Sequence, residues 1–233
     1  MIRIRNLSVR FGGVRALDGL DAELAAPIVG LIGPNGAGKT TLLNVLSGFI
    51  RPVAGAVMLD DVDLLALSPI RRVTLGLRRT FQQEVVVDDL TLWENVQAIA
   101  DHVARDRTGT DIERAIAFVG LQRSRHVPGR HANLFERRMV EIAKTLVGRP
   151  RLILMDEPGA GLNEAETDTL RRLLLDIPAA FDTQLVLIDH DADLIASVCI
   201  ETLVLDFGKR LALGPTRGVL DDPAVRRAYL GTA

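Results

Sequence analysis

The residues best suited to chemistry form a glycine-rich run at positions 33–40, which ends in Gly38-Lys39-Thr40. Its pattern, G-x-x-x-x-G-K-[ST], is typical of a phosphate-binding loop. Glycines let successive backbone N–H groups turn toward a polyphosphate. Lys39 can reach the β- and γ-phosphates, and the Thr40 hydroxyl can hold Mg²⁺. The residues expected to contact the nucleotide are Asn35, Gly36, Ala37, Gly38, Lys39, Thr40 and Thr41.

The segments on either side of this loop are the strand and the helix that a phosphate-binding loop requires. An apolar run at residues 28–32 predicts a buried strand, and residues 41–49 predict a helix. A strand, a loop and a helix in this order present a phosphate to a helix N-terminus. A chance glycine-rich turn would not have both flanking elements.

A second group of polar residues, Asp156 and Glu157, follows the apolar run 152–155. Burial of that strand would hold both carboxylates at its carboxyl end. We expect Asp156 to support Mg²⁺ and Glu157 to polarise the attacking water. The alternative is a solvated turn, which the buried strand and the upstream loop disfavour.

Two further residues are candidates because of where they lie. His190 follows the apolar run 185–188, at the sheet edge where α/β proteins bind ligands, so a contact to the γ-phosphate is expected. The alternative is a structural histidine, which is the usual role, and the other three histidines are expected on the surface or in packing. Gln82 precedes the helical part of the chain, where its amide can contact Mg²⁺ or water.

The composition limits the function classes. The chain has 233 residues, of which 48% are hydrophobic, and a formal net charge of -2, which gives no reason to expect nucleic-acid binding. Its single cysteine, Cys199, excludes an internal disulfide and is expected to be packed in the interior. We see no targeting signal and no apolar run near the length of a spanning helix. We therefore expect a soluble chain that reaches a membrane only through a partner.

The order of elements predicts an α/β fold with a parallel sheet, interrupted by a helical insertion at about residues 84–149. One nucleotide-binding domain, residues 1–233, is expected. Capping-box patterns begin at Thr91 and Thr110, and Gly120 is a plausible helix stop. The other expected elements are the strands 2–11, 17–24 and 56–59 of an antiparallel sheet, the strands 152–155, 185–188 and 203–205, and the helices 164–175 and 192–198.

Taken together, these segments resemble the ATP-binding subunit of an ABC transporter. The resemblance implies a P-loop NTPase core with an N-terminal antiparallel β subdomain, ATP and Mg²⁺ as ligands, and ATP hydrolysis. Gln82 matches the glutamine loop, residues 152–156 match Walker B, and Glu157 matches the catalytic base. Residues 160–163 match the D-loop and His190 the switch histidine. Phe11 aligns with the aromatic residue that stacks on adenine, although it could instead be a core phenylalanine.

Finer strings resemble the branched-chain amino acid importer branch; they lie at residues 11–14, 79–82, 161–163, 205–208 and 228–231. This resemblance implies a peripheral subunit on the cytoplasmic face of the inner membrane. Its expected partners are transmembrane permease subunits, a second ATP-binding subunit and, indirectly, a substrate-binding protein. The imported solute would be an amino acid or a related small amide. The expected permease-docking surface is residues 84–92, with the apolar patch Val85-Val86-Val87.

The family's signature, Leu-Ser-Gly-Gly-Gln, is replaced here by residues 132–136, Ala-Asn-Leu-Phe-Glu. In the family this motif caps the partner's ATP across a head-to-tail dimer. Asn133 can still cap the following helix, with Glu136 completing a capping box, which is also how an ordinary helix begins. We therefore predict an asymmetric pair, with a different cassette favoured as the mate. The alternative to an ATP-hydrolysing importer subunit is a non-hydrolytic ATP-binding regulatory or assembly module.

Overall fold

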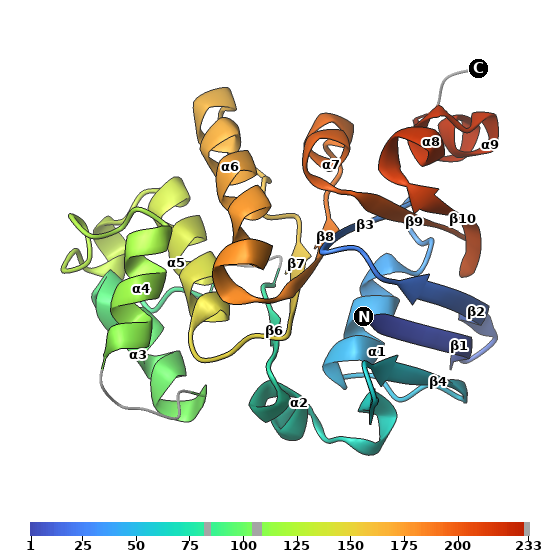
Figure 1. Cartoon of the computed structure of the whole chain (residues 1–233), viewed down its shortest axis with the longest axis horizontal. Helices are drawn as coiled ribbons and strands as arrows, with labels where there is room; N and C mark the ends of the chain where they lie inside the picture. The colour runs from blue at the N-terminus through green and yellow to red at the C-terminus, as the bar shows by residue number, and fades with distance from the viewer. Residues whose placement is uncertain (82–84, 104–108, 231–233) are drawn as a thin grey trace. The chain divides into compact units, whose positions relative to one another are not determined.

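The computed structural model describes residues 1–81, 85–103 and 109–230. The chain divides into two compact units. The first unit comprises residues 1–72 and 184–233, and the second comprises residues 73–183. The colours of Figure 1 follow the chain through both units.

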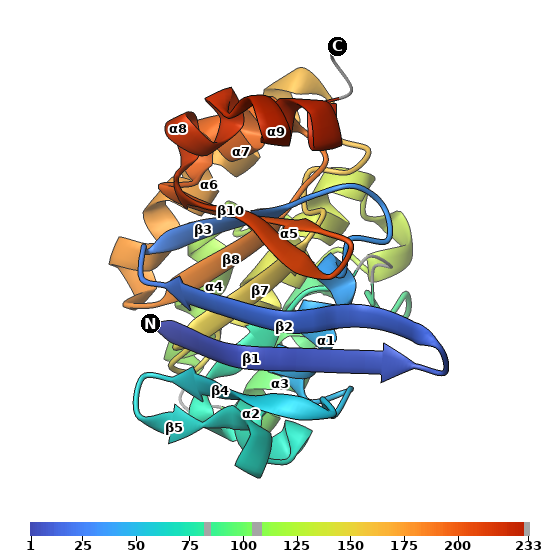
Figure 2. The ribbon, with the colours of Figure 1, turned by 90° about the vertical axis from the view of Figure 1, so that its right-hand side faces the viewer.

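An antiparallel sheet opens the first unit, with the strand order β2-β1-β4-β5 (Figure 2). Buried and exposed residues alternate along β1, as expected for a strand with one face on the core. The predicted strand 2–11 is confirmed, whereas the two others begin earlier than expected. The strands are β1 (Ile2–Phe11), β2 (Val14–Leu24), β4 (Ala54–Leu59) and β5 (Val62–Asp63).

The same unit contains a second group of strands, in which β3 (Ile28–Ile32) pairs in parallel with β8 (Gln184–Ile188) and β9 (Glu201–Asp206). Every residue of β3 and β8 is buried, which explains their continuous apolar sequence. β10 (Lys209–Pro215) adds an antiparallel edge that the sequence did not predict. The helices of this unit are α1 (Lys39–Ser47), η1 (Leu64–Ala66), α7 (Ala192–Val198), α8 (Thr216–Asp221), α9 (Pro223–Val225) and η3 (Arg226–Leu230).

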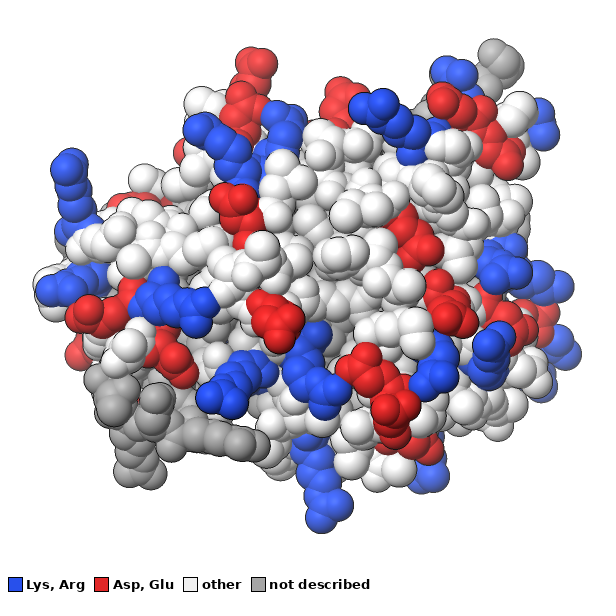
Figure 3. All heavy atoms as spheres, in the orientation of Figure 1, with Lys and Arg blue, Asp and Glu red and all other residues white. Residues whose placement is uncertain are grey.

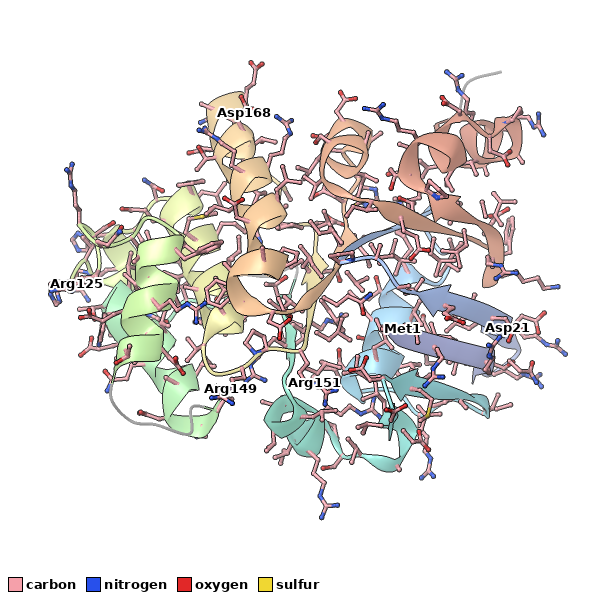
Figure 4. The ribbon with its side chains drawn as sticks, viewed as in Figure 1. Met1, Asp21, Arg125, Arg149, Arg151 and Asp168 are labelled. Atoms are coloured by element: carbon pink, nitrogen blue, oxygen red, sulfur yellow. The ribbon has the colours of Figure 1, made fainter. Side chains whose placement is uncertain are left out.

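The second unit pairs β6 (Leu77–Arg79) in parallel with β7 (Leu152–Asp156). Three of its helices, α3, α4 and α5, pack on one another. Arg125, labelled in Figure 4, has its guanidinium 5.8 Å from the ring centroid of Trp93 and 3.7 Å from the carboxylate of Glu113, so it links α3 to α4. The helices are α3 (Leu92–Val103), α4 (Thr110–Phe118), η2 (Gly129–His131), α5 (Leu134–Leu146) and α6 (Glu164–Phe181), and α2 (Pro69–Leu75) spans the junction of the two units.

Three predictions about helix ends are wrong. The helix expected at residues 41–49 is α1, Lys39–Ser47, which ends at the left-handed Gly48. The capping box at Thr91 is confirmed, but α4 has Gly109 as its N-cap, so Thr110 is its first helical residue rather than its cap. The helix predicted to end at 175 continues as α6 through Pro178. It continues because apolar residues keep the spacing that buries one face, ending at Ile177 and Phe181.

The structure thus has the fold class that the sequence predicts, an α/β fold with an antiparallel N-terminal sheet and a largely parallel core sheet. The extent of a helical insertion, 84–149, stays a prediction. Within the described part of the chain, no helix combines the length and the apolar character that a membrane crossing requires.

Candidate functional site

The glycine-rich loop joins β3 to α1 in the first unit, as the sequence predicts. Three of its glycines have a positive φ, and at two of them an added Cβ atom would also clash with neighbouring backbone. Gly33 has φ 146°, and a Cβ atom there would lie 2.1 Å from the carbonyl oxygen of Leu205. Gly38 has φ 104°, and its Cβ would lie 2.5 Å from the carbonyl oxygen of Ala16. The loop is therefore packed closely against neighbouring backbone, which holds its shape.

Lys39 begins α1 and is only 8% exposed. Its Nζ donates hydrogen bonds to the carbonyl oxygens of Gly33, at 2.6 Å, and Pro34, at 2.9 Å. The ammonium group thus lies within the curve of the loop. Asn35, Gly36 and Thr40 are exposed on the same loop, so their backbone N–H groups and the Thr40 hydroxyl can reach a ligand.

Gly208, in the turn between β9 and β10, supports the loop from outside. Its N–H donates to the carbonyl oxygen of Ala37 at 3.0 Å, and its own carbonyl accepts from the N–H of Asp18 at 3.0 Å. Sequence reasoning assigned no role to this residue. The only signal was its place in the string 205–208.

His190 lies on the same sheet edge as the loop. β3 and β8 run in parallel with Gly30 opposite Leu187, so their carboxyl ends are neighbours. The loop follows β3, and Asp189 and His190 follow β8. His190 is exposed, whereas Asp189 is buried. The first unit therefore brings together the loop and the histidine that the sequence proposed as partners.

Phe11 ends β1 and is 50% exposed. The alternative that it is a core phenylalanine is therefore wrong. A half-exposed aromatic ring at a strand end can stack on a planar ligand.

The second unit carries Asp156, which ends β7 and is only 4% exposed. Its Oδ2 lies 3.6 Å from Nη2 of Arg79, and its backbone N–H donates to Oγ1 of Thr80 at 3.2 Å. The guanidinium of Arg79 also lies over the ring of Phe81, at 5.1 Å. Burial lowers the pKa of Arg79, and the Asp156 carboxylate opposes this shift. Arg79 and Thr80 belong to the string 79–82, but no local pattern in the sequence marks them as supports of Asp156.

Glu157 has a backbone φ of 53°, in the left-handed region that non-glycine residues seldom adopt. It follows the buried Asp156 directly and is itself partly exposed. Its carbonyl accepts from the N–H of Ala160 at 3.2 Å, which closes the turn. Strained backbone of this kind is found preferentially at functional sites, where surrounding structure holds it in place.

Asn133 caps α5 through a complete capping box. Its side chain accepts from the N–H of Glu136 at 2.8 Å, and the Glu136 carboxylate accepts from the N–H of Asn133 at 3.1 Å. Arg137 donates to Asp88 and to the carbonyl of Gly129, both at 2.9 Å. The N–H groups of Asn133 and Glu136, at the start of α5, are therefore satisfied within the chain by a carboxylate and a side-chain amide oxygen.

Two expectations fall partly or wholly outside the described residues. Gln82 is one of them, as is residue 84 of the expected docking surface. The apolar patch in that surface is smaller than predicted, because Val86 is buried while Val85 and Val87 are exposed. Charges of both signs are interspersed on the face shown in Figure 3.

A family model, two curated relatives and a solved structure all match this chain. A family model described as ABC transporter matches residues 20–160. LivG of Escherichia coli (strain K12), a high-affinity branched-chain amino acid transport ATP-binding protein, is 33% identical over 256 residues, covering 100% of this chain and 98% of LivG. LptB of Acidithiobacillus ferridurans, a lipopolysaccharide export system ATP-binding protein, is 34% identical over 206 residues, covering 88% of this chain and 85% of LptB.

The ADP conformation of MJ1267, an ATP-binding cassette of an ABC transporter, has a TM-score of 0.87 at 27% identity, covering 100% of this chain and 99% of MJ1267.

Proposed function

The chain belongs to the ABC transporter family as an ATP-binding ATPase subunit, and from this premise we propose that it drives the uptake of branched-chain amino acids, or of a related small amide. The observation that carries this proposal is the similarity to LivG over both whole chains. The subunit would act at the cytoplasmic face of the membrane, bound to a permease that receives its solute from a substrate-binding protein. The whole chain would form one ATP-binding domain, with a helical insertion at about 84–149.

The site residues would divide the work of hydrolysis. Lys39 and the loop N–H groups would bind the phosphates, and Phe11 would stack on adenine. His190 would contact the γ-phosphate, because it follows the strand next to the one that leads into the loop. Glu157 would act as general base toward the attacking water, with Gln82 linking the site to the helical insertion.

Mg²⁺ fits the donor set, because Thr40 offers a hydroxyl oxygen and Asp156 a carboxylate oxygen, the hard ligands this ion prefers. No group of three or more His, Cys, Asp or Glu side chains suited to a metal occurs among the described residues. Mg²⁺ commonly takes only one or two protein ligands and completes its shell with phosphate oxygens and water. When bound, it would neutralise charge on the β- and γ-phosphates.

Hydrolysis is tested with Glu157→Gln. Removal of the base should lower the rate of phosphate release by about 100-fold or more while leaving ATP affinity unchanged. Phosphate release and nucleotide binding are measured side by side on the parent and the variant. Equal rates would remove Glu157 as the base and would favour the non-hydrolytic module.

Transport is tested in cells that express the protein natively. Deletion of the chain should abolish uptake of labelled leucine or of a small amide, and the parent gene, but not Glu157→Gln, should restore it. The similarity to LptB favours a second candidate, an export subunit for lipopolysaccharide. Intact uptake combined with a loss of surface lipopolysaccharide would select that candidate and overturn the first.

We further propose that the chain pairs with a different cassette. The support is the altered signature, where Leu134 and Phe135 stand in place of two glycines and the Asn133–Glu136 box engages two N–H groups at the helix start. This subunit would supply an intact ATP site that the mate's signature completes. Glu157→Gln with ATP should remain monomeric in size-exclusion chromatography and should dimerise only with the co-purified mate. A symmetric ATP-bound dimer of this chain alone, with full turnover by the parent, would contradict the asymmetry.

A further inference from the structure

The only tyrosine of the chain, Tyr229, lies in the C-terminal turn η3 and contacts the loop that carries His190. Its hydroxyl, which has one proton to donate, lies 3.2 Å from the carbonyl oxygen of Asp189 and 3.4 Å from that of His190, so the two oxygens share its hydrogen bond. About forty residues of chain separate the two segments, and both belong to the first unit. Tyr229 belongs to the string 228–231 noted in the sequence, but neither the motifs nor the proposed function assigns it a role.

The loop around His190 is fixed on one side by two aspartates. Oδ1 of Asp189 accepts from the N–H of Asp191 at 3.0 Å. Oδ1 of Asp191 accepts from the N–H groups of Asp193, at 2.8 Å, and Leu194, at 3.1 Å, which caps α7. These bonds hold the backbone after His190. The Tyr229 hydroxyl instead bonds to the carbonyl groups of residues 189 and 190. These carbonyls belong to the peptide units that set the direction of the imidazole.

The C-terminal segment that carries Tyr229 is anchored independently of its hydroxyl. Thr216 donates its N–H to the carbonyl of Ile200 at 3.0 Å, and its hydroxyl lies 2.9 Å from that of Thr202. Asp222 caps α9 by accepting from the N–H of Ala224 at 2.7 Å, and Val225 is fully buried. Loss of one phenolic oxygen therefore leaves the segment docked.

We propose that Tyr229 is a positioning residue for His190, holding the loop so that the imidazole faces the γ-phosphate of bound ATP. This inference rests on the proposed function of His190. Burial raises the pKa of Tyr229, and the carboxylates of Asp189 and Asp191 raise it further. The phenol thus stays protonated, and able to donate, at neutral pH. The C-terminal turn is thereby linked directly to the step in which the γ-phosphate is sensed.

The test is Tyr229→Phe, which removes the hydroxyl and keeps the ring. The ATPase rate is measured on the transporter complex purified through a tag on this chain, after subtraction of the rate of the Glu157→Gln complex. We expect kcat to fall by about three- to tenfold, the effect of one lost hydrogen bond, while KM for ATP changes by less than about twofold. An unchanged kcat, or a loss confined to KM, would overturn the proposal.

Thr216→Val is the matched control, because it also removes a hydroxyl that holds the C-terminal segment but does not touch the His190 loop. It should lower the unfolding midpoint at least as much as Tyr229→Phe and leave kcat at the parent value. If Thr216→Val lowered kcat to the same degree, the effect of Tyr229→Phe would be general destabilisation, and the positioning role would be refuted.

A double-mutant cycle with His190→Ala separates this inference from the proposed function. If Tyr229 acts through His190, Tyr229→Phe should cause no further loss of kcat in the His190→Ala background. A full additional loss would refute the positioning role while leaving the role of His190 intact. Unchanged kcat in His190→Ala alone would instead refute the assigned role of the histidine, and the inference with it.

Discussion

Lys39 is held within the phosphate loop by two carbonyl groups of that same loop. Its charge is therefore already directed inward, with little rotamer freedom left to lose on binding. Lys39→Ala should weaken ATP binding by at least about tenfold, since it removes a charge-assisted contact to phosphate. A titration with a fluorescent ATP analogue measures this. Lys144→Ala makes the same change of charge outside the loop, and a similar loss of affinity in that variant would contradict the assignment.

Glu157 combines a proposed catalytic role with a backbone conformation that costs an L-residue stability. Both Glu157→Gly and Glu157→Ala should abolish hydrolysis. The glycine variant should nevertheless be the more stable, by about 1 kcal/mol, because glycine adopts a positive φ without strain. Urea unfolding of both variants provides the comparison.

The control for Glu157 is Asp176, which is exposed within α6. At this position the order of stability should reverse. The unfolding free energy of Asp176→Ala should be about 1 kcal/mol higher than that of Asp176→Gly, as in any helix interior. If alanine were also the more stable residue at position 157, the strain argument would fail.

At the scale of elements, three helices of the described part of the chain begin with the same reciprocal cap, in which a side chain accepts from one N–H and a glutamate from another. The caps are Thr91 on α3, Asn133 on α5 and Asn163 on α6. Alanine at each of these positions should cost about 1 kcal/mol of unfolding free energy, measured by urea denaturation. A markedly smaller cost for Asn133 alone would show that its cap is not formed in solution.

The ends of parallel strands explain how this fold gathers its chemistry. The phosphate loop and His190 follow β3 and β8, and Asp156 ends β7 beside Thr80, which follows β6. In both units the candidate functional residues lie at, or just after, the end of a strand whose residues are all buried. Burial fixes the strand, and the strand fixes the direction in which the next residues leave the sheet.

At the scale of the whole molecule, alkaline pH should destabilise the protein. Burial raises the pKa of the Cys199 thiol from 9.0 to about 12, and Tyr229 is shifted in the same direction. The folded state thus keeps these protons when the unfolded chain has lost them. This contribution is fully present below about pH 9 and is lost as the pH rises toward about 12.

Unfolding free energies measured at about pH 8 and about pH 10.5 should therefore show a clear decrease for the parent protein. Cys199→Ala should be less stable at both values, because it leaves a small cavity, but its decrease should be smaller. Equal decreases in the two proteins would mean that the thiol ionises as readily in the folded state as in the unfolded chain.

Much of the fold follows from local sequence patterns. The strands β1 and β3 and the helix α7 have the bounds that were predicted, because their apolar spacing is regular and their ends carry strong stop or cap signals. Among the elements that were missed, β6 and β10 are short or lie at a sheet edge, where few residues are buried and the pattern is weak. The cap of α4 was misassigned because Thr110 fits a capping box as well in the sequence as Thr91 does.

The sequence by itself identified the candidate phosphate loop, the acidic pair and the histidine, because each motif is contiguous and its proposed chemistry depends on residue type and spacing. Only the tertiary structure revealed that Gly208 supports the loop, that Arg79 and Thr80 hold Asp156, and that Tyr229 reaches the backbone of His190. These contacts join segments far apart in the chain. They depend on how strands pair and helices pack, and no local pattern encodes that.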